Sequence, residues 1–278
     1  TEDAMEMSKV VVDCTPSGND MKDRWYKDYE KNTDLFIAQG SEFGLGKQYA
    51  RGINDEVLEV GKDKYLQVVS CNTHNLSVLI KTFGLGDQGP ENLEEGRFVC
   101  MRRANDISQD DKFVPSPQVG NHGDDRFGTH HARDAWHLYQ TKGEAYDFNL
   151  FSSAMKVNSQ LMHIIQFYMK VAKPVKKEEL VERVVADDRL AITYKTTANS
   201  IFSFGRDHGF CGRILNQSVI PLDPLHISED GTRITGYCFT PQDGNSLLSS
   251  VAATVWGLYP ETYDKIVQCL RPYFFQEV

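Results

Sequence analysis

The sequence has few cysteines, and their spacing marks no structural site. Its six cysteines, at positions 14, 71, 100, 211, 238 and 269, form no C-x-x-C pair, which argues against the common zinc spacings and against a disulfide framework. A reducing compartment is the simplest setting for such thiols. Each cysteine is therefore expected to be either a small buried hydrophobe or a reactive group.

Long apolar runs and clusters of basic residues are also missing. No run approaches the roughly 18 residues of a membrane-spanning helix, and the first residues lack the basic-then-apolar order of a secretory signal. The net charge of −9 argues against general affinity for nucleic acid or anionic membranes. We therefore expect a cytoplasmic protein with no nucleic-acid or membrane partner, in which a phosphorylated ligand needs a local basic pocket.

The glycine-rich phosphate fingerprint of dinucleotide-binding domains is not found either. Gly44 and Gly46, in the stretch FGLGKQYARG, follow a turn and do not open a helix after a strand. The elements that are present begin with two apolar strands, 9–13 and 34–38, on either side of a helix at 21–31. This order predicts a parallel sheet, which a third strand at 64–69 extends.

The order of elements changes after residue 71. Strands are expected at 97–101, within 151–171, and at 190–194, 218–220 and 233–239, with helices at 76–83, 177–185 and 249–258 and a functional loop over the polar stretch 106–139. We therefore predict an α/β plus α+β fold. An incomplete Rossmann-type parallel sheet domain comprises residues 1–70 and 246–278, and an α+β catalytic domain with a mainly antiparallel sheet comprises residues 71–245.

Cys71 is the cysteine whose surroundings point to chemistry. It lies in QVVSCNTHNL, just past the strand 64–69, and open α/β sheets bind ligands at the carboxyl ends of their strands. A helix that starts just after Cys71 would aim its unpaired N–H groups at the sulfur and favour the thiolate. The alternative is a small buried hydrophobe, which is the usual role of a single cysteine after a strand.

Seven short blocks of the chain occur in an informative order. They are VVDCTPSG at 11–18, QG at 39–40, SCNT at 70–73, RRAND at 102–106, THHARD at 129–134, LMH at 161–163 and FGRD at 204–207. In this order they resemble the archaeal-type (type II) phosphorylating glyceraldehyde-3-phosphate dehydrogenases, from about residue 9 to residue 270. The resemblance implies a homotetrameric two-domain enzyme that uses NAD or NADP, with glyceraldehyde 3-phosphate and inorganic phosphate as substrates. It also implies a cysteine thioester, which phosphate releases as an acyl phosphate.

The resemblance also implies roles for individual residues. Cys71 would be the nucleophile with Asn72 beside it, His163 the general base, and Asp106 an acidic residue near that base. The phosphate groups would contact Thr73, His130, His131 and one of Arg102 and Arg103, because neighbouring strand residues face opposite sides. The cofactor would contact Thr15, Pro16, Gly18, Gln39, Gly40 and either Asn245 or Ser250.

The chain departs from the family pattern in three places. The family carries two histidines one residue apart on the strand of the base, whereas His163 is followed here by Ile164 and Ile165. Ser250 stands where the family has an asparagine that holds the nicotinamide, although Asn245 is close. The chain also begins at the middle strand of the family's Rossmann domain. Because Val10–Val12 is apolar on both faces, we expect an upstream segment or a partner chain to complete the sheet there.

Three other interpretations stay open. Four histidines and three aspartates fall within residues 122–137, a mixture that can ligate a transition metal, but the adjacent His130 and His131 fit no known spacing and we predict no metal. A related cysteine-dependent semialdehyde or acyl-phosphate reductase would share the thioester chemistry. A degenerate, non-catalytic paralogue would bind a phosphorylated ligand without redox chemistry.

Overall fold

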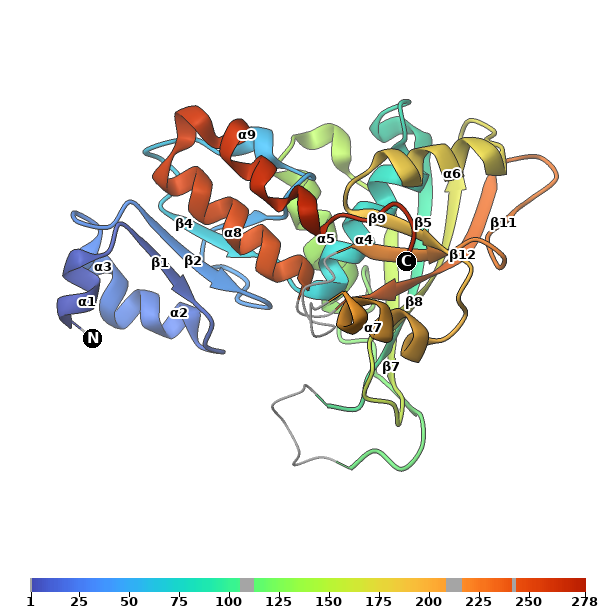
Figure 1. The fold of residues 1–278 in the computed structure, drawn as a ribbon, viewed down its shortest axis with the longest axis horizontal. Coiled ribbons are helices and arrows are strands. Elements are labelled where there is room, and N and C mark those ends of the chain that lie inside the picture. The colour runs from blue at the N-terminus through green and yellow to red at the C-terminus, as the bar shows by residue number, and fades with distance from the viewer. Residues whose placement is uncertain (1, 106–112, 209–216, 242–243) are drawn as a thin grey trace.

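Two β-sheets organise the chain, as the computed structural model shows for residues 2–105, 113–208, 217–241 and 244–278 (Figure 1). The smaller sheet is parallel throughout and has the order β1 (Val10–Asp13), β2 (Leu35–Gln39), β4 (Tyr65–Val68), β3 (Lys47–Tyr49). The three strands predicted for this part are confirmed. β3 was missed, because three residues that include a lysine and a glutamine carry no strand pattern of their own.

The larger sheet is mixed and mainly antiparallel. Its order is β6 (Gln118–Val119), β7 (Leu150–Lys156), β5 (Leu93–Arg102), β8 (His163–Val171), β12 (Arg233–Thr240), β10 (Ser218–Pro221), β9 (Leu190–Thr193), with β11 (His226–Ile227) on β12. Among the pairs of strands that the structure describes in it, β5–β7 and β9–β10 are parallel and the others are antiparallel. The predicted fold class, a parallel α/β sheet plus an α+β part, is confirmed.

Helices cover both sheets. They are α1 (Glu2–Met7), α2 (Gly18–Met21) with a π-turn over Lys22–Tyr26, α3 (Lys27–Tyr29), α4 (Cys71–Leu79) with a π-helical extension over Ile80–Leu85, α5 (His130–Gln140), α6 (Lys177–Ala186), α7 (Ala198–Asp207), α8 (Gly244–Leu258) and α9 (Tyr263–Ile266). Short 3₁₀ turns lie at Asp55–Val57, Pro90–Asn92, Glu144–Tyr146, Pro260–Thr262 and Val267–Tyr273. No helix in the described ranges is both long and apolar enough to cross a membrane.

Two of the predicted elements need correction. Residues 106–139 were expected to be one loop, but α5 occupies His130–Gln140, because Ala132, Ala135 and Leu138 form a fully buried apolar face. The helix predicted over 76–83 starts earlier, at Cys71, and it is not amphipathic. Its residues from Asn72 to Leu79 are all buried, polar ones included.

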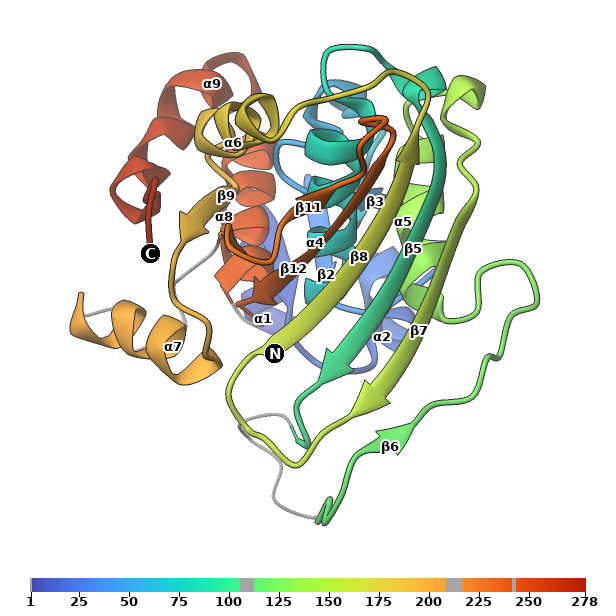
Figure 2. The same cartoon turned by 90° about the vertical axis from the view of Figure 1, so that its right-hand side faces the viewer.

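α4 lies between the two sheets and belongs to the main core. Figure 2 shows α4 and α5 behind the larger sheet, on the same face. Their apolar side chains, such as Leu76 and Leu138, pack with Phe98, Ile165 and Phe167 from β5 and β8. A second core forms where Ala252 of α8 packs on the smaller sheet. Burying the whole of α4 places its first turn at the junction of both sheets.

β1 lies at one edge of the smaller sheet in the described chain. Its partner is β2, and Val12 is 40% exposed. Strand edges that are apolar and unpaired promote aggregation. The pairing of this edge with an upstream segment or a partner chain stays a prediction.

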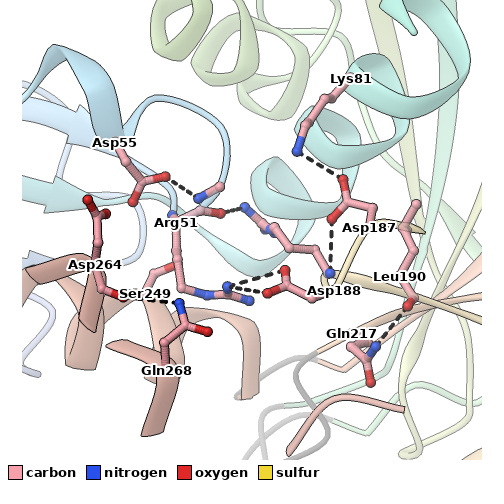
Figure 3. A network of polar contacts seen from close by, with 12 residues as sticks. Arg51, Asp55, Lys81, Asp187, Asp188, Leu190, Gln217, Ser249, Asp264 and Gln268 are labelled. Carbon is pink, nitrogen blue, oxygen red and sulfur yellow. Dashed lines mark hydrogen bonds and ion pairs between the residues drawn. The ribbon is translucent and has the colours of Figure 1, made fainter. Parts of the chain in front are cut away.

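Polar contacts join the two parts of the molecule beside α4 (Figure 3). The Arg51 guanidinium lies 3.3 Å from a carboxylate oxygen of Asp188, and the buried Arg189 donates a hydrogen bond to the carbonyl of Arg51. Burial lowers the pKa of Arg189 to about 10, so its side chain stays charged at neutral pH. Lys81, at the end of α4, is paired with Asp187 at 3.0 Å.

Asp55 is the acceptor that ties the C-terminal helices to the smaller sheet. Its Oδ1 accepts hydrogen bonds from the hydroxyls of Tyr49 and Tyr263, at 2.7 and 2.8 Å, and its Oδ2 accepts from the N–H of Gly52. We expect Asp55→Ala to lower the free energy of unfolding by about 3 kcal/mol, because it leaves three donors without their acceptor, and Tyr263→Phe to lower it by about 1 kcal/mol.

Urea unfolding of the two variants measures this difference. Asp264→Ala, at an exposed position on the same segment, is the matched control and should stay within about 0.5 kcal/mol of the native chain. An Asp55→Ala variant as stable as this control would show that the acceptor has no structural role.

Candidate functional site

A pocket of about 530 Å³ opens where the carboxyl ends of the parallel strands meet α4, α5 and the larger sheet. The smaller sheet contributes Cys14, Gln39, Gly40 and Ser41, and the start of α4 contributes Ser70, Cys71 and Asn72. The rest of the lining consists of Arg102, His130, His131 and His163, with Ser246 and Leu247 from α8. The pocket therefore brings together segments that are far apart in the chain. Six of the residues that the sequence analysis predicts to be catalytic or to bind phosphate are among those that line it.

Cys71 is the first residue of α4, and several hydrogen bonds hold it there. The Ser70 hydroxyl caps the helix by accepting from the N–H of Thr73 at 3.4 Å. The carbonyl of Cys71 accepts from the side-chain amides of Asn75, at 2.6 Å, and Asn245, at 3.2 Å. The thiol therefore lies at the positive end of a helix dipole, which favours the thiolate.

His74, one turn further on, ties this helix start to α8. Its Nδ1 lies 3.0 Å from the Ser70 carbonyl and its Nε2 lies 2.8 Å from the Ser249 hydroxyl. Because a carbonyl can only accept, Nδ1 carries the proton and Nε2 accepts from Ser249. Complete burial lowers the pKa of His74 to about 3, so the ring is neutral.

His163 opens β8 on the face that points to α4. It shares that face with Ile165 and Phe167, and it is 3% exposed. The N–H of Arg103 donates to its Nδ1 at 3.0 Å. The preceding residue, Met162, has φ +55°, the only positive φ outside glycine among the described residues. Such strained conformations cluster at functional sites, where surrounding structure holds them.

The two neighbouring arginines have different places. Arg102 shares a strand face with Phe98 and Cys100, and its side chain lines the pocket. Arg103 is buried, lies outside the pocket lining and contributes its main chain to His163. Arg102 is therefore the arginine that the structure brings to the site.

His130 and His131 form the first turn of α5, with ring centroids 4.0 Å apart. Burial lowers the pKa of both, that of His131 well below its usual value, so the pair is neutral. Both ring nitrogens of His131 and the Oδ1 of Asn72 are buried without a hydrogen-bond partner. Unpaired buried polar atoms cost free energy, so these groups suit a ligand that pairs with them.

The first turns of two helices, α4 and α5, thus line the pocket. Their N–H groups and dipoles favour an anion, as does the Arg102 guanidinium. This local positive potential exists within a chain of net charge −9. It is a local basic pocket of the kind that was expected for a phosphorylated ligand.

The predicted cofactor residues divide into two groups. Gln39 and Gly40, at the end of β2, line the pocket, and Gln39 donates to the Ser250 hydroxyl at 2.7 Å. The side-chain amide of Asn245 donates a hydrogen bond to the carbonyl of Cys71, which lines the pocket. Thr15, Pro16 and Gly18 do not line the pocket. A glycine is needed at position 18 for packing, because a Cβ there would lie 2.9 Å from the Cβ of Ala38.

Thr73 lies elsewhere than the sequence analysis expected. Thr73 is fully buried, and its hydroxyl lies 3.0 Å from that of the capping residue Ser70, so it does not line the pocket. Asp106 lies outside the described residues. Within the described part of the chain, no group of three histidine, cysteine or acidic residues is arranged to hold a metal ion. Ser246 and Leu247 were missed, since a serine and a leucine at a helix start carry no chemical signal.

Comparison with known proteins gives a consistent result. No protein-family model matches this sequence. The glyceraldehyde-3-phosphate dehydrogenase of Picrophilus torridus is 28% identical over 201 residues, 70% of this chain and 54% of that protein. Those of Sulfolobus acidocaldarius and Archaeoglobus fulgidus are 27% and 26% identical over 81% and 74% of this chain, and 63% and 58% of their own length.

The chain is similar to archaeal glyceraldehyde-3-phosphate dehydrogenases. It spans between about half and two thirds of the length of these curated relatives. The similarity agrees with the resemblance carried by the seven sequence blocks.

Iodoacetamide labelling tests whether Cys71 is the reactive thiol. We expect Cys71 to be alkylated first at neutral pH, because it lies in the pocket at a helix start. Cys100 and Cys238 should stay unlabelled until the chain unfolds, because burial raises the pKa of each to about 12 and keeps the thiol protonated. Peptide mapping identifies the labelled residue. Faster labelling of Cys14, which also lines the pocket, would contradict the assignment.

The buried His74 predicts a pH dependence of stability. Its pKa is about 3 in the folded chain against 6.5 as the usual value, so between these pH values the unfolded chain binds the extra proton. The stabilisation is complete above pH 6.5 and decreases as the pH falls toward 3, by up to about 1.4 kcal/mol per pH unit. Urea midpoints from pH 7 to 4 should show a shallower slope for His74→Gln and an unchanged slope for His226→Gln, an exposed control.

Proposed function

We propose that this protein oxidises glyceraldehyde 3-phosphate with NAD or NADP, through a thioester on Cys71 that inorganic phosphate releases as an acyl phosphate. One observation carries the proposal. Cys71, at the start of α4, shares a single pocket with Arg102, with the histidine pair at the start of α5, and with the carboxyl end of β2. The proposed nucleophile, the proposed anion site and the strand end that would contact the cofactor thus lie in one cavity.

The anion-binding wall supports a phosphorylated aldehyde as substrate. An aldehyde phosphate must present its carbonyl to the sulfur while its phosphate is held elsewhere. Arg102 has an Nε that is buried without a partner, and both nitrogens of His131 are also unpaired. The Arg102 Nε–H and the single N–H of the neutral His131, with the N–H groups of α5, can bind the phosphate of the substrate or the attacking inorganic phosphate.

The edge of the smaller sheet supports a nicotinamide cofactor. Parallel sheets bind dinucleotides at the carboxyl ends of their strands. Gly40 has φ +86°, and the space that a Cβ would occupy there is open, so a ligand can approach the backbone closely. Gln39, Gly40 and the start of α8 would hold the nicotinamide end, and the nicotinamide, when bound, accepts a hydride.

Two finer proposals concern organisation. The division into a nucleotide-binding domain (1–70 and 246–278) and a catalytic domain (71–245) is supported by the two sheets and their separate cores. A homotetramer is supported by the outer face of the larger sheet. That face carries the half-buried apolar side chains Val99, Met101, Phe151 and Tyr168, which suit contact with a second copy.

The activity is tested with the purified protein, glyceraldehyde 3-phosphate, and NAD or NADP. Without inorganic phosphate, we expect intact-mass spectrometry to show an acyl adduct on Cys71. With phosphate, Cys71→Ser should lower turnover at least roughly 10³-fold, because it removes the thiolate. Cys269→Ser, at an exposed position away from the pocket, is the matched control and should retain full turnover.

Two results would overturn the proposal. One is an adduct that forms equally well in the Cys71→Ser variant. The other is a native protein that binds the phosphorylated aldehyde but forms neither adduct nor reduced cofactor, as a non-catalytic phosphate-binding protein would.

A further inference from the structure

We propose that a second pocket, at the end of α4 opposite to Cys71, binds a nucleoside monophosphate. The pocket has a volume of about 600 Å³ and shares no lining residue with the pocket around Cys71. Its lining comes from the π-helical extension of α4, the end of α6 and the C-terminal 3₁₀ turn Val267–Tyr273, with the residues that directly follow them. The proposal is independent of the proposed function, because no residue of the catalytic pocket takes part in it.

Arg183, on α6, is the group that points to an anionic ligand. Within the ranges that the structure describes, neither its guanidinium nor that of Arg271, which also lines the pocket, has an ion pair or a hydrogen bond. Arg183 is half-buried and its guanidinium lies against the backbone of Gly86, where a Cβ would come within 2.7 Å of Cζ. A guanidinium placed in this way is suited to bidentate hydrogen bonds with a phosphate.

The acidic residues of the pocket leave these two arginines uncompensated. Asp187 is paired with Lys81 at 3.0 Å, and Asp188 is paired with Arg51 at 3.3 Å (Figure 3). The remaining carboxylate of the lining is that of the exposed Asp87. Two arginines against one aspartate leave a small positive charge, so a single phosphate group suits the pocket better than a triphosphate.

Thr82 adds a buried polar group without a partner. It lies in the π-helical extension of α4, belongs to the lining of the pocket and is 5% exposed. Its hydroxyl has no hydrogen-bond partner among the described residues. Such a hydroxyl costs free energy until it is paired, so a ligand that pairs with it gains affinity. π-helical turns are also frequent at functional sites.

The rest of the lining suits a planar and hydroxylated body. The volume is within the range of small-molecule sites and exceeds what a phosphate group needs. Phe274 contributes an aromatic ring, on which a base can stack. The Gln268 side chain donates to the carbonyl of Asp264 through Nε2, so its Oε1 can accept from a ligand, as can the carboxylate of Asp87. A ring and two acceptors match a base with ribose hydroxyls.

The ligand would connect the two parts of the molecule. α6 packs in the core of the larger sheet through Leu180 and Val184, whereas the C-terminal 3₁₀ turn packs on the smaller sheet through Val267. A phosphate held by both Arg183 and Arg271 would therefore join the two cores. We expect the ligand to raise the Tm, because the site exists only in the folded chain.

Calorimetric titration of the full chain tests the proposal with three probes, adenosine 5′-monophosphate, ribose 5-phosphate and inorganic phosphate. We expect adenosine monophosphate to bind with a Kd on the order of 10⁻⁴ M. Ribose 5-phosphate should bind at least about tenfold more weakly, because it has no base to stack on Phe274. Inorganic phosphate should bind more weakly than either.

Three variants locate the binding. Arg183→Gln should weaken binding of adenosine monophosphate at least about tenfold, because it removes a charged donor. Thr82→Val should weaken it about fivefold without lowering the urea midpoint of unfolding, because the lost hydroxyl has no partner within the described chain. Lys265→Gln, which removes an exposed cation from the neighbouring α9, is the matched control and should bind like the native protein.

Each of three results would overturn the proposal. The first is no saturable binding of adenosine monophosphate by the native protein. The second is equal affinity in the native protein and Arg183→Gln, as binding at the cofactor edge of the catalytic pocket would give. The third is inorganic phosphate that binds as tightly as adenosine monophosphate, which would reduce the pocket to a simple anion site. Failure to form an acyl adduct on Cys71 would count against the proposed function and would leave these titrations unchanged.

Discussion

The first turn of α4 is the constraint on which the rest of the site depends. The Ser70 and Cys71 carbonyls and the Ser70 hydroxyl accept hydrogen bonds from His74, Asn75, Asn245 and the Thr73 N–H. These donors come from α4 itself and from α8, which packs on the smaller sheet. A helix buried on all sides cannot leave such groups unpaired without a large cost. The thiol is therefore held at one point where both sheets, α5 and α8 meet.

Main-chain groups set the chemistry around that thiol more than charged side chains do. The proposed anion site consists of two helix starts and one arginine, in a chain with an excess of acidic residues. The histidines beside it are neutral, because burial lowers the pKa of His74, His130 and His131.

Much of the fold was predictable from local pattern. The strands at 9–13, 34–38 and 64–69 are apolar runs between polar turns, and such runs are confirmed as β1, β2 and β4. The failures have physical reasons. β3 is three residues long and exists because β4 offers it a partner, and α5 was hidden because His130, His131 and Arg133 mask an apolar face of alanines and one leucine. The fully buried polar turns of α4 could not be foreseen, because their partners are remote in the sequence.

The sequence by itself determined the family resemblance, the position of Cys71 after a parallel strand, and the residue types gathered near it. These depend on local order, which a single chain displays directly. Only the tertiary structure decided that Arg102 rather than Arg103 reaches the pocket, that Thr73 is buried beside the helix cap Ser70, and that His163 faces α4. Each of these depends on which atom of a distant segment lies next to the side chain. Such a contact cannot be predicted from the residues that are adjacent in the sequence.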